Sequence, residues 1–266
     1  MGVAANYNVR DMHRAIKAIT QLHRISEVPE VRRLTPDWRK LLTAYLGFPN
    51  PRLPFSIRCN GSTFEFRERS DIPTFWQVFF AHIYPVRPSD RLIIDVGANI
   101  GAFTLYALLH APQAHVIAIE PAPDTVERLR NLLEQHGLLA RCTIVHAALA
   151  AKAGSTTIEV AAASQLRVTG KGGVTVPTVT LDSVVDGHEK VDLLKIDAEG
   201  AEFEALPAAS AATLGKIERM EMEYHPWGDR PALFAHLQQQ GFQLTLAKDN
   251  PGEPGYGMAS LVRAGA

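Results

Sequence analysis

The sequence predicts an α/β fold built on a mostly parallel seven-stranded sheet. From Arg91 onward, short apolar runs alternate with stretches of helical period, which is the pattern of βαβ units. A glycine-rich turn directly follows the first apolar run, as in α/β folds that bind nucleosides. The last two apolar runs flank a Pro- and Gly-rich turn and therefore predict an antiparallel hairpin at the sheet edge.

An extension of residues 1–90 precedes this core, and its expected elements are helices and a small β-ribbon. Apolar side chains recur every three or four residues over 8–47, which predicts two helices. Alternating apolar residues on both sides of Asn60 and Gly61 predict the ribbon, and residues 73–84 predict a third helix. We expect the extension to pack on the core.

The core spans residues 91–266 and contains strands and helices in alternation. Its strands are expected at 91–96, 115–120, 142–147, 191–197 and 216–223, followed by a hairpin of 242–248 and 256–263. Its helices are expected at 100–110, 124–136, 200–212 and 230–240. The Ala-rich stretch 147–163 is given no special function.

Composition and charge limit the partners of the protein. Its net charge is -1, so no bulk positive potential attracts nucleic acid or an anionic membrane. Two cysteines are too few for a disulfide framework or a thiolate zinc site. No apolar run approaches the roughly 20 residues that span a bilayer, and the N-terminus does not resemble a secretory leader. The sequence therefore predicts a cytoplasmic protein that binds neither nucleic acid nor membranes.

The first core strand and the turn after it predict a nucleoside site. Gly97 permits a backbone conformation that side chains with a Cβ avoid, and Gly101 allows the next helix to pack closely on the strand. Glu120 ends the second core strand roughly 20 residues after the last glycine, where an acid accepts hydrogen bonds from ribose hydroxyls. This pair alone does not distinguish a mononucleoside from a dinucleotide.

The turn itself favours S-adenosylmethionine over NAD. A dinucleotide-binding loop has glycines at its first, third and sixth positions, whereas this turn reads Gly-Ala-Asn-Ile-Gly-Ala from Gly97. Asp95, at the end of the strand, would place a negative charge near any pyrophosphate but would suit the ammonium of a methionyl group.

A second group of polar residues follows the strand 191–197. Ligands of open α/β sheets bind at the carboxyl ends of the strands, and Asp197 stands at such an end. It could orient the methionyl group, act as a base, bind a metal or cap the next helix. Lys195 lies two residues earlier on the same face of a buried strand and needs a carboxylate, for which we predict Glu221 or Glu223.

The strand 216–223 contributes the candidate general base. A period of two places Glu221, Glu223 and His225 on one face, with His225 nearest the ligand edge. An imidazole has a pKa suited to accepting a hydroxyl proton near neutral pH. The structural alternative is that His225 bonds a backbone group at the strand end and never meets the substrate.

Five blocks carry a resemblance to a known family. They are, in order, 95–105 (DVGANIGAFTL), 120–121 (EP), 180–182 (TLD), 194–202 (LKIDAEGAE) and 223–226 (EYHP). Together they resemble the FkbM family of methyltransferases, over about residues 55–262. The resemblance implies a Rossmann-like class I methyltransferase fold, S-adenosylmethionine as cofactor, and usually the O-methylation of a hydroxyl.

The motifs and the resemblance together give the expected site residues. The cofactor site would consist of Asp95, Gly97, Ala98, Asn99, Gly101, Glu120, Pro121 and Asp197. The candidates for catalysis are His225, Asp197, Glu223 and Lys195. A divalent metal is not favoured; in a metal-dependent enzyme, Asp197 and Glu223 would be its ligands.

The expected substrate is a hydroxyl of a small molecule or a glycan, as in secondary metabolism. Two alternatives stay open at this point, an N-methyltransferase and a module that binds S-adenosylmethionine without catalysis. The sequence does not fix the oligomeric state, for which a homodimer is one option.

Overall fold

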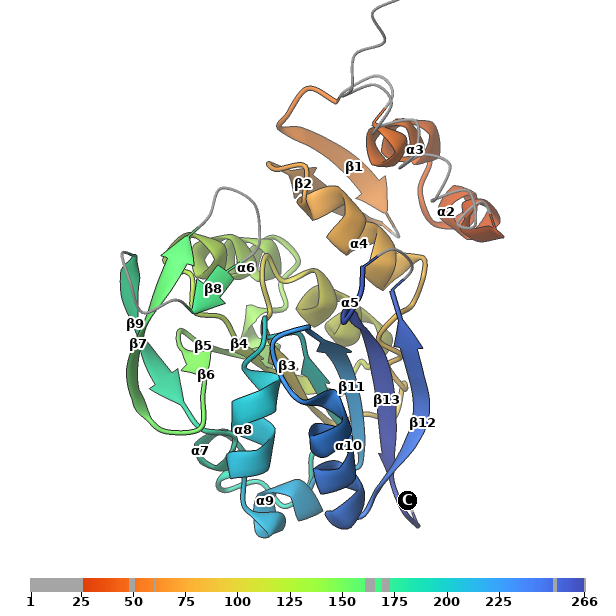
Figure 1. Cartoon of the computed structure of the whole chain (residues 1–266). Helices are drawn as coiled ribbons and strands as arrows, with labels where there is room; N and C mark the ends of the chain where they lie inside the picture. The colour runs from red at the N-terminus through yellow and green to blue at the C-terminus, as the bar shows by residue number, and fades with distance from the viewer. Residues whose placement is uncertain are drawn as a thin grey trace, which may run out of the picture. The chain divides into compact units, whose positions relative to one another are not determined.

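The structure is a computed structural model, and it describes residues 26–47, 51–59, 61–160, 166–168, 173–250 and 253–265. The chain forms two compact units, residues 1–83 and 84–266 (Figure 1). The division falls a few residues before the predicted one because residues 84–90 bond to the second unit. Asp90 forms a buried ion pair with Arg219 at 2.6 Å, and the Tyr84 ring packs edge-on against Phe103.

The first unit contains three described helices and a two-stranded ribbon. Its elements are α2 (Val28–Leu34), α3 (Trp38–Leu46), β1 (Phe55–Cys59), β2 (Ser62–Phe66) and α4 (Asp71–Phe79). The predicted antiparallel ribbon is confirmed. Of the two helices predicted over 8–47, the second is present as α3, and the first lies outside the described residues. The predicted helix 73–84 begins and ends earlier, as α4.

The second unit is built on the predicted sheet. Its seven strands have the order β12-β13-β11-β10-β3-β4-β5. They are β3 (Leu92–Val96), β4 (His115–Ile119), β5 (Cys142–Val145), β10 (Leu193–Ile196), β11 (Arg219–Tyr224), β12 (Phe242–Asp249) and β13 (Gly257–Arg263). All neighbours from β11 to β5 pair in parallel, and β13 pairs antiparallel with β11 and β12. The mostly parallel sheet with its C-terminal antiparallel hairpin is therefore confirmed.

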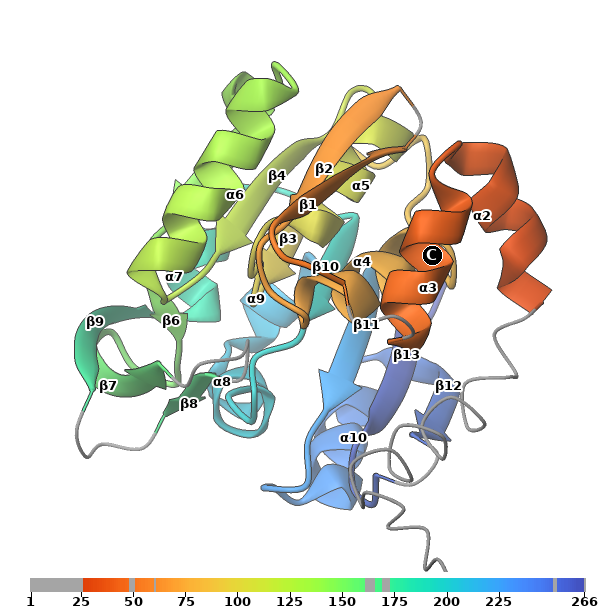
Figure 2. The same cartoon turned by 90° about the horizontal axis from the view of Figure 1, so that it is seen from above.

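Helices cover the sheet and follow the predicted order. They are α5 (Ala102–His110), α6 (Pro123–Gln135), the short 3-10 helix η2 (Leu139–Arg141), α7 (Leu181–Val185), α8 (Glu202–Ala208), α9 (Ala211–Gly215) and α10 (Arg230–Gln239). α8 and α10 pack side by side in front of the sheet (Figures 1 and 2). The predicted helix 200–212 is split into α8 and α9, because Pro207 lacks an N–H and Ser210 caps a new helix by accepting from the Thr213 N–H.

A second, four-stranded sheet lies between β5 and β10 in the chain, where no strand was predicted. Its strands are β6 (Ala148–Leu149), β7 (Gly154–Val160), β8 (Leu166–Val168) and β9 (Val174–Val179), in the order β6-β9-β7-β8. β6 and β8 have only two and three residues, Gly154 begins β7 and Pro177 lies within β9, and each of these features weakens a strand pattern. This sheet matters for function because it supplies one wall of the cavity described below.

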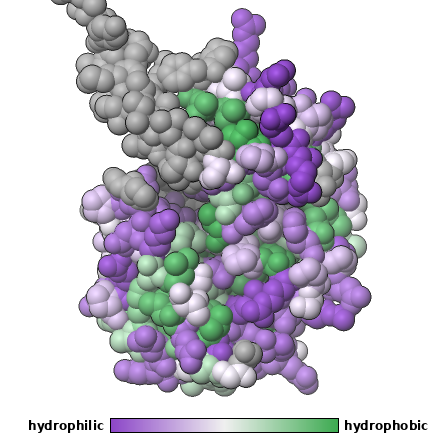
Figure 3. Space-filling model, turned by 90° about the vertical axis from the view of Figure 1, so that its right-hand side faces the viewer, coloured by the Kyte–Doolittle hydropathy of each residue, from purple (hydrophilic) through white to green (hydrophobic). Residues whose placement is uncertain are grey.

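No helix in the described part of the chain is long and apolar enough to cross a membrane. Hydrophobic and hydrophilic side chains are interspersed on the face shown in Figure 3. Among the described residues, the exposed large hydrophobic side chains are Val174, Trp227 and Leu246.

Candidate active site

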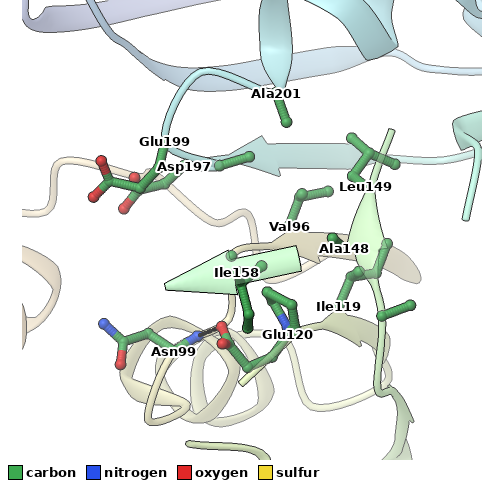
Figure 4. A pocket seen from close by; sticks show the side chains of 14 residues that line it. Val96, Asn99, Ile119, Glu120, Ala148, Leu149, Ile158, Asp197, Glu199 and Ala201 are labelled. Carbon is green, nitrogen blue, oxygen red and sulfur yellow. Dashed lines mark hydrogen bonds between the residues drawn. The ribbon is translucent and has the colours of Figure 1, made fainter. Parts of the chain in front are cut away.

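A cavity opens at the carboxyl ends of β3, β4 and β10, the edge at which ligands of open α/β sheets bind. It holds about 700 Å³ of empty space, part of it open to solvent. Its lining residues are Val96, Gly97, Asn99, Ile119, Glu120, Pro121, Ala147, Ala148, Leu149, Ile158, Asp197, Ala198, Glu199 and Ala201. Figure 4 shows Glu120 and Asn99 on one side, the carboxylates of Asp197 and Glu199 on another, and apolar side chains between them.

The turn after β3 fits between two neighbouring strands. Gly97 has a φ of +71°, and a Cβ at this position would overlap the backbone carbonyl of Asp197. The N–H groups of Gly97 and Ala98 both donate to the carbonyl of Ile119, each at 3.0 Å. The close approach of two backbones therefore requires glycine here and leaves the main chain exposed toward the cavity.

Asn99 and Glu120 are coupled by a hydrogen bond across the turn. Asn99 adopts the left-handed conformation at φ +50°, which asparagine tolerates better than most residues. Its backbone N–H donates to Glu120 Oε2 at 2.8 Å, and the Ala122 N–H donates to Glu120 Oε1 at 3.0 Å. The turn thus fixes the direction of the Glu120 carboxylate.

Glu120 is buried at the end of β4 and lines the cavity. Burial raises the pKa of its carboxyl to about 7, although the hydrogen bonds from Ala122 and Asn99 act in the opposite direction. Its carboxylate can accept hydrogen bonds from hydroxyls in the cavity. Beside it, Ile119, Leu149 and Ile158 form an apolar wall to which the second sheet contributes (Figure 4).

Asp95 and Lys195 form a buried ion pair beneath the turn. The Lys195 Nζ lies 3.1 Å from Asp95 Oδ1, and Thr104 donates its hydroxyl to Asp95 Oδ2 at 2.6 Å. The same ammonium donates to the carbonyls of Val96 and Gly97, at 3.1 and 2.8 Å. Burial lowers the pKa of Lys195, but Asp95 and Asp197 outweigh it and the net direction is upward.

The predicted pairing of Lys195 with Glu221 or Glu223 is wrong. Parallel pairing places Lys195 level with Asp95 on β3 and with Glu221 on β11. Glu221 instead accepts a hydrogen bond at 2.5 Å from the hydroxyl of Ser260 on β13. Lys195 therefore turns toward β3, where its ammonium holds the Gly97 turn by two carbonyls rather than reaching into the cavity.

His225 follows β11 and is 3% exposed. Its Nδ1 lies 2.8 Å from Glu202 Oε1, and its own backbone N–H donates to the same oxygen at 3.1 Å. The other Glu202 oxygen accepts from the Gly200 N–H at 2.9 Å. The side chain of His225 thus bonds a carboxylate, not the backbone group that the structural alternative required.

The second ring nitrogen of His225 faces the cavity carboxylates. Nε2 lies 3.7 Å from Glu199 Oε2 and 3.9 Å from Asp197 Oδ1, both beyond hydrogen-bond length. Burial lowers the pKa of the imidazole, but the Glu202 hydrogen bond and the charges of Glu202, Asp197 and Glu199 together raise it above its ordinary value. A carboxylate on Nδ1 stabilises the tautomer that leaves Nε2 able to accept a proton.

Glu223 lies on β11, two residues before His225. Burial, followed by the charge of Asp197, raises the pKa of the Glu223 carboxyl to about 8. Among the described residues, no three His, Cys, Asp or Glu side chains are arranged to hold a metal ion.

The predicted cofactor residues divide into two groups in the structure. The residues that line the cavity are Gly97, Asn99, Glu120, Pro121 and Asp197. Asp95, Ala98 and Gly101 lie behind it: Asp95 holds Lys195, Ala98 bonds Ile119, and Gly101 packs on Leu129. Asp197 does not cap a helix, because α8 begins at Glu202.

Sequence reasoning missed Glu202 and, in the second sheet, Ile158. Glu202 is not among the candidate residues taken from the sequence, yet its carboxylate bonds His225. The available signal was its position, because Gly200 lets the chain turn sharply between the strand end and the helix. No sequence signal placed Ile158 at the cavity.

Comparisons with known proteins match the chain to methyltransferases. Residues 95–244 match the model of the methyltransferase FkbM domain. Methyltransferase sdnD of Sordaria araneosa is 30% identical over 64% of this chain and 81% of its own length. The hexuronic acid methyltransferase AglP of Haloferax volcanii is 29% identical, over 62% of this chain and 68% of its own.

Two further proteins carry the family name. The 31-O-demethyl-FK506 methyltransferase FkbM of Streptomyces tacrolimicus is 28% identical over 64% of this chain and 79% of its own length. The crystal structure of methyltransferase FkbM from Methylobacillus flagellatus matches 92% of this chain and 60% of its own, with 15% identity and a TM-score of 0.51. That structural likeness supports the fold.

Proposed function

The chain belongs to the FkbM family and is an S-adenosylmethionine-dependent methyltransferase, and we propose that it methylates a hydroxyl of a small molecule or a sugar. The observation that carries the proposal is the His225–Glu202 pair. The Nδ1 of His225 is held by the buried carboxylate of Glu202, while the Nε2 of His225 faces the edge of the cavity. Such a pair suits the removal of a proton from a hydroxyl.

The cavity residues fit the adenosyl part of the cofactor. Gly97 lets a ligand approach the main chain, the Glu120 carboxylate can accept from two ribose hydroxyls, and the wall of Ile119, Leu149 and Ile158 suits an apolar face such as that of adenine. Asp197 borders the opposite side and, with its side chain 34% exposed, can accept from the methionyl ammonium. S-adenosylmethionine, when bound, supplies an electrophilic methyl group on a sulfonium.

Affinity for the cofactor should depend on pH through Glu120. Because its carboxyl has a pKa of about 7 and the ionised form accepts ribose hydrogen bonds best, affinity for S-adenosylhomocysteine should fall as the pH drops below about 7. Calorimetry from pH 5.5 to 8.5 should show an affinity that levels off above that value. Glu120→Gln should bind more weakly and lose this pH dependence. An equally steep dependence in the variant would contradict the assignment.

His225 would act on the acceptor as a general base. Its neutral imidazole would take the hydroxyl proton on Nε2 while the oxygen gains the methyl group and S-adenosylhomocysteine leaves as the neutral thioether, and the proton would pass to solvent after turnover. The resulting imidazolium is stabilised by Glu202 on Nδ1 and by Asp197 and Glu199 beside Nε2. Lys195 is a positioning residue, because its ammonium holds the Gly97 turn.

One relative is named for a 31-O-demethyl substrate, which supports an oxygen acceptor, and another is named for hexuronic acid, which supports a sugar. The proposal is tested by measuring release of S-adenosylhomocysteine with matched panels of alcohols, sugars and primary amines. Turnover of hydroxyl compounds alone is expected. Preference for amines would favour the N-methyltransferase, to which the carboxylates of Asp197 and Glu199 would also be suited. Full cofactor affinity without turnover of either panel would favour the non-catalytic module.

A further inference from the structure

Three aromatic rings meet next to the proposed base. The indole of Trp227 lies parallel to the imidazole of His225, with centroids 5.2 Å apart and an interplanar angle of 8°. The ring of Tyr256 stands nearly perpendicular to both, at 5.6 Å from His225 and 5.8 Å from Trp227. These three residues, here called the aromatic corner, come from the segment after β11 and the loop before β13.

The aromatic corner combines a buried ring with an exposed one. His225 is 3% exposed, whereas Trp227 is 44% exposed. The indole edge packs on the cavity loop, because a Cβ at Gly200 would come within 3.1 Å of Trp227 Cε3. The turn that contains Trp227 packs on the loop between β12 and β13, because a Cβ at Gly255 would come within 3.0 Å of Pro226 Cα. Trp227 is therefore held in place while much of its ring meets solvent.

Carboxylates border the aromatic corner on its cavity side. Glu199 and Asp197 lie within 3.9 Å of His225 Nε2, and their side chains are 23% and 34% exposed. His225 covers one face of the indole, and the exposed part of Trp227 offers an apolar contact to the C–H groups of a saturated ring. Neighbouring carboxylates accept hydrogen bonds from vicinal hydroxyls, and they repel an anionic acceptor.

We infer that the aromatic corner binds the methyl acceptor, and that the acceptor is a neutral sugar ring. The C–H groups of the sugar pack against the exposed part of Trp227 on its cavity side, one hydroxyl reaches His225 Nε2, and a neighbouring hydroxyl bonds Glu199 or Asp197. This inference rests on the proposed function, because it uses His225 as the base. It adds Trp227 and Tyr256 as residues that determine acceptor specificity.

Binding of simple glycosides tests the inference. With S-adenosylhomocysteine present, methyl pyranosides of glucose, galactose and mannose are titrated against the full chain by ligand-observed NMR, beside the matching glucuronide. At least one neutral glycoside should bind in a saturable way, and more tightly than the glucuronide. Trp227→Ala should weaken that binding at least about tenfold, and Trp227→Phe should restore most of it.

Leu246→Ala is the matched control, because Leu246 is a similarly exposed apolar side chain on β12, and its binding should equal that of the wild type. Equal binding by Trp227→Ala, no binding of any neutral glycoside, or tighter binding of the glucuronide would overturn the inference. His225→Ala separates the two proposals. Loss of turnover supports the base and retained turnover removes it, whereas the Trp227 variants test acceptor binding independently of His225.

Discussion

His225→Ala should lower kcat by roughly 10²- to 10⁴-fold and leave the affinity for S-adenosylhomocysteine unchanged. The variant removes the proposed proton acceptor, whereas the residues that line the cofactor cavity stay in place. Steady-state rates and calorimetry on the same preparation check both parts. His115→Ala is a suitable control. His115 is the first residue of β4, so it lies at the end of the strand away from the cavity, and it bonds Thr143. An unchanged kcat would remove His225 from the reaction.

The pH dependence of the rate provides a second readout for this pair. The neutral imidazole is the active form, so the rate should rise with pH through the raised pKa of His225 and then level off. Glu202 raises that pKa, and Glu202→Gln should therefore move the rising limb to lower pH while lowering the plateau. A limb that stays in place would show that Glu202 only supports the local structure.

Gly97→Ala should abolish cofactor binding and destabilise the second unit by on the order of 3–5 kcal/mol. A left-handed φ costs alanine about 1–2 kcal/mol by itself. At Gly97 the added Cβ would also overlap the Asp197 carbonyl, and neither backbone can move freely because each residue directly follows one of two paired strands. Chemical denaturation and calorimetry with S-adenosylhomocysteine measure the two effects.

Gly187→Ala isolates the conformational cost from the overlap. Gly187 has a φ of +76°, close to that of Gly97, but nothing lies within 4 Å of an added Cβ. The control should lose only about 1 kcal/mol and should bind the cofactor normally. Equal losses in the two variants would mean that the close approach of β3 and β10 does not constrain the turn.

The sequence predicted the features that depend on local patterns. Apolar runs gave the strands of the large sheet, and the glycines after β3 marked the turn that approaches β10. The period of two along β11 predicts that His225 lies where the strand ends, and its Nε2 lies 3.9 Å from Asp197 Oδ1 there. These features follow from backbone geometry, which short stretches of sequence encode directly.

Features that depend on contacts between distant segments were not predictable. Lys195 lies level with carboxylates on both neighbouring strands, and only the hydroxyl of Ser260, on a third strand, decides which one it pairs with. Glu202 reaches His225 because the chain reverses at Gly200, which no periodicity shows. The second sheet, and with it the wall at Ile158, was missed because β6 and β8 are very short and because Gly154 and Pro177 interrupt the pattern in β7 and β9.

A crystal structure of the chain with S-adenosylhomocysteine tests the central claim most directly. The account predicts that both ribose hydroxyls lie within hydrogen-bond distance of the Glu120 carboxylate, with the nucleoside against Gly97 and the adenine against Leu149 and Ile158. A ligand bound elsewhere, or a ribose that does not contact Glu120, would contradict it.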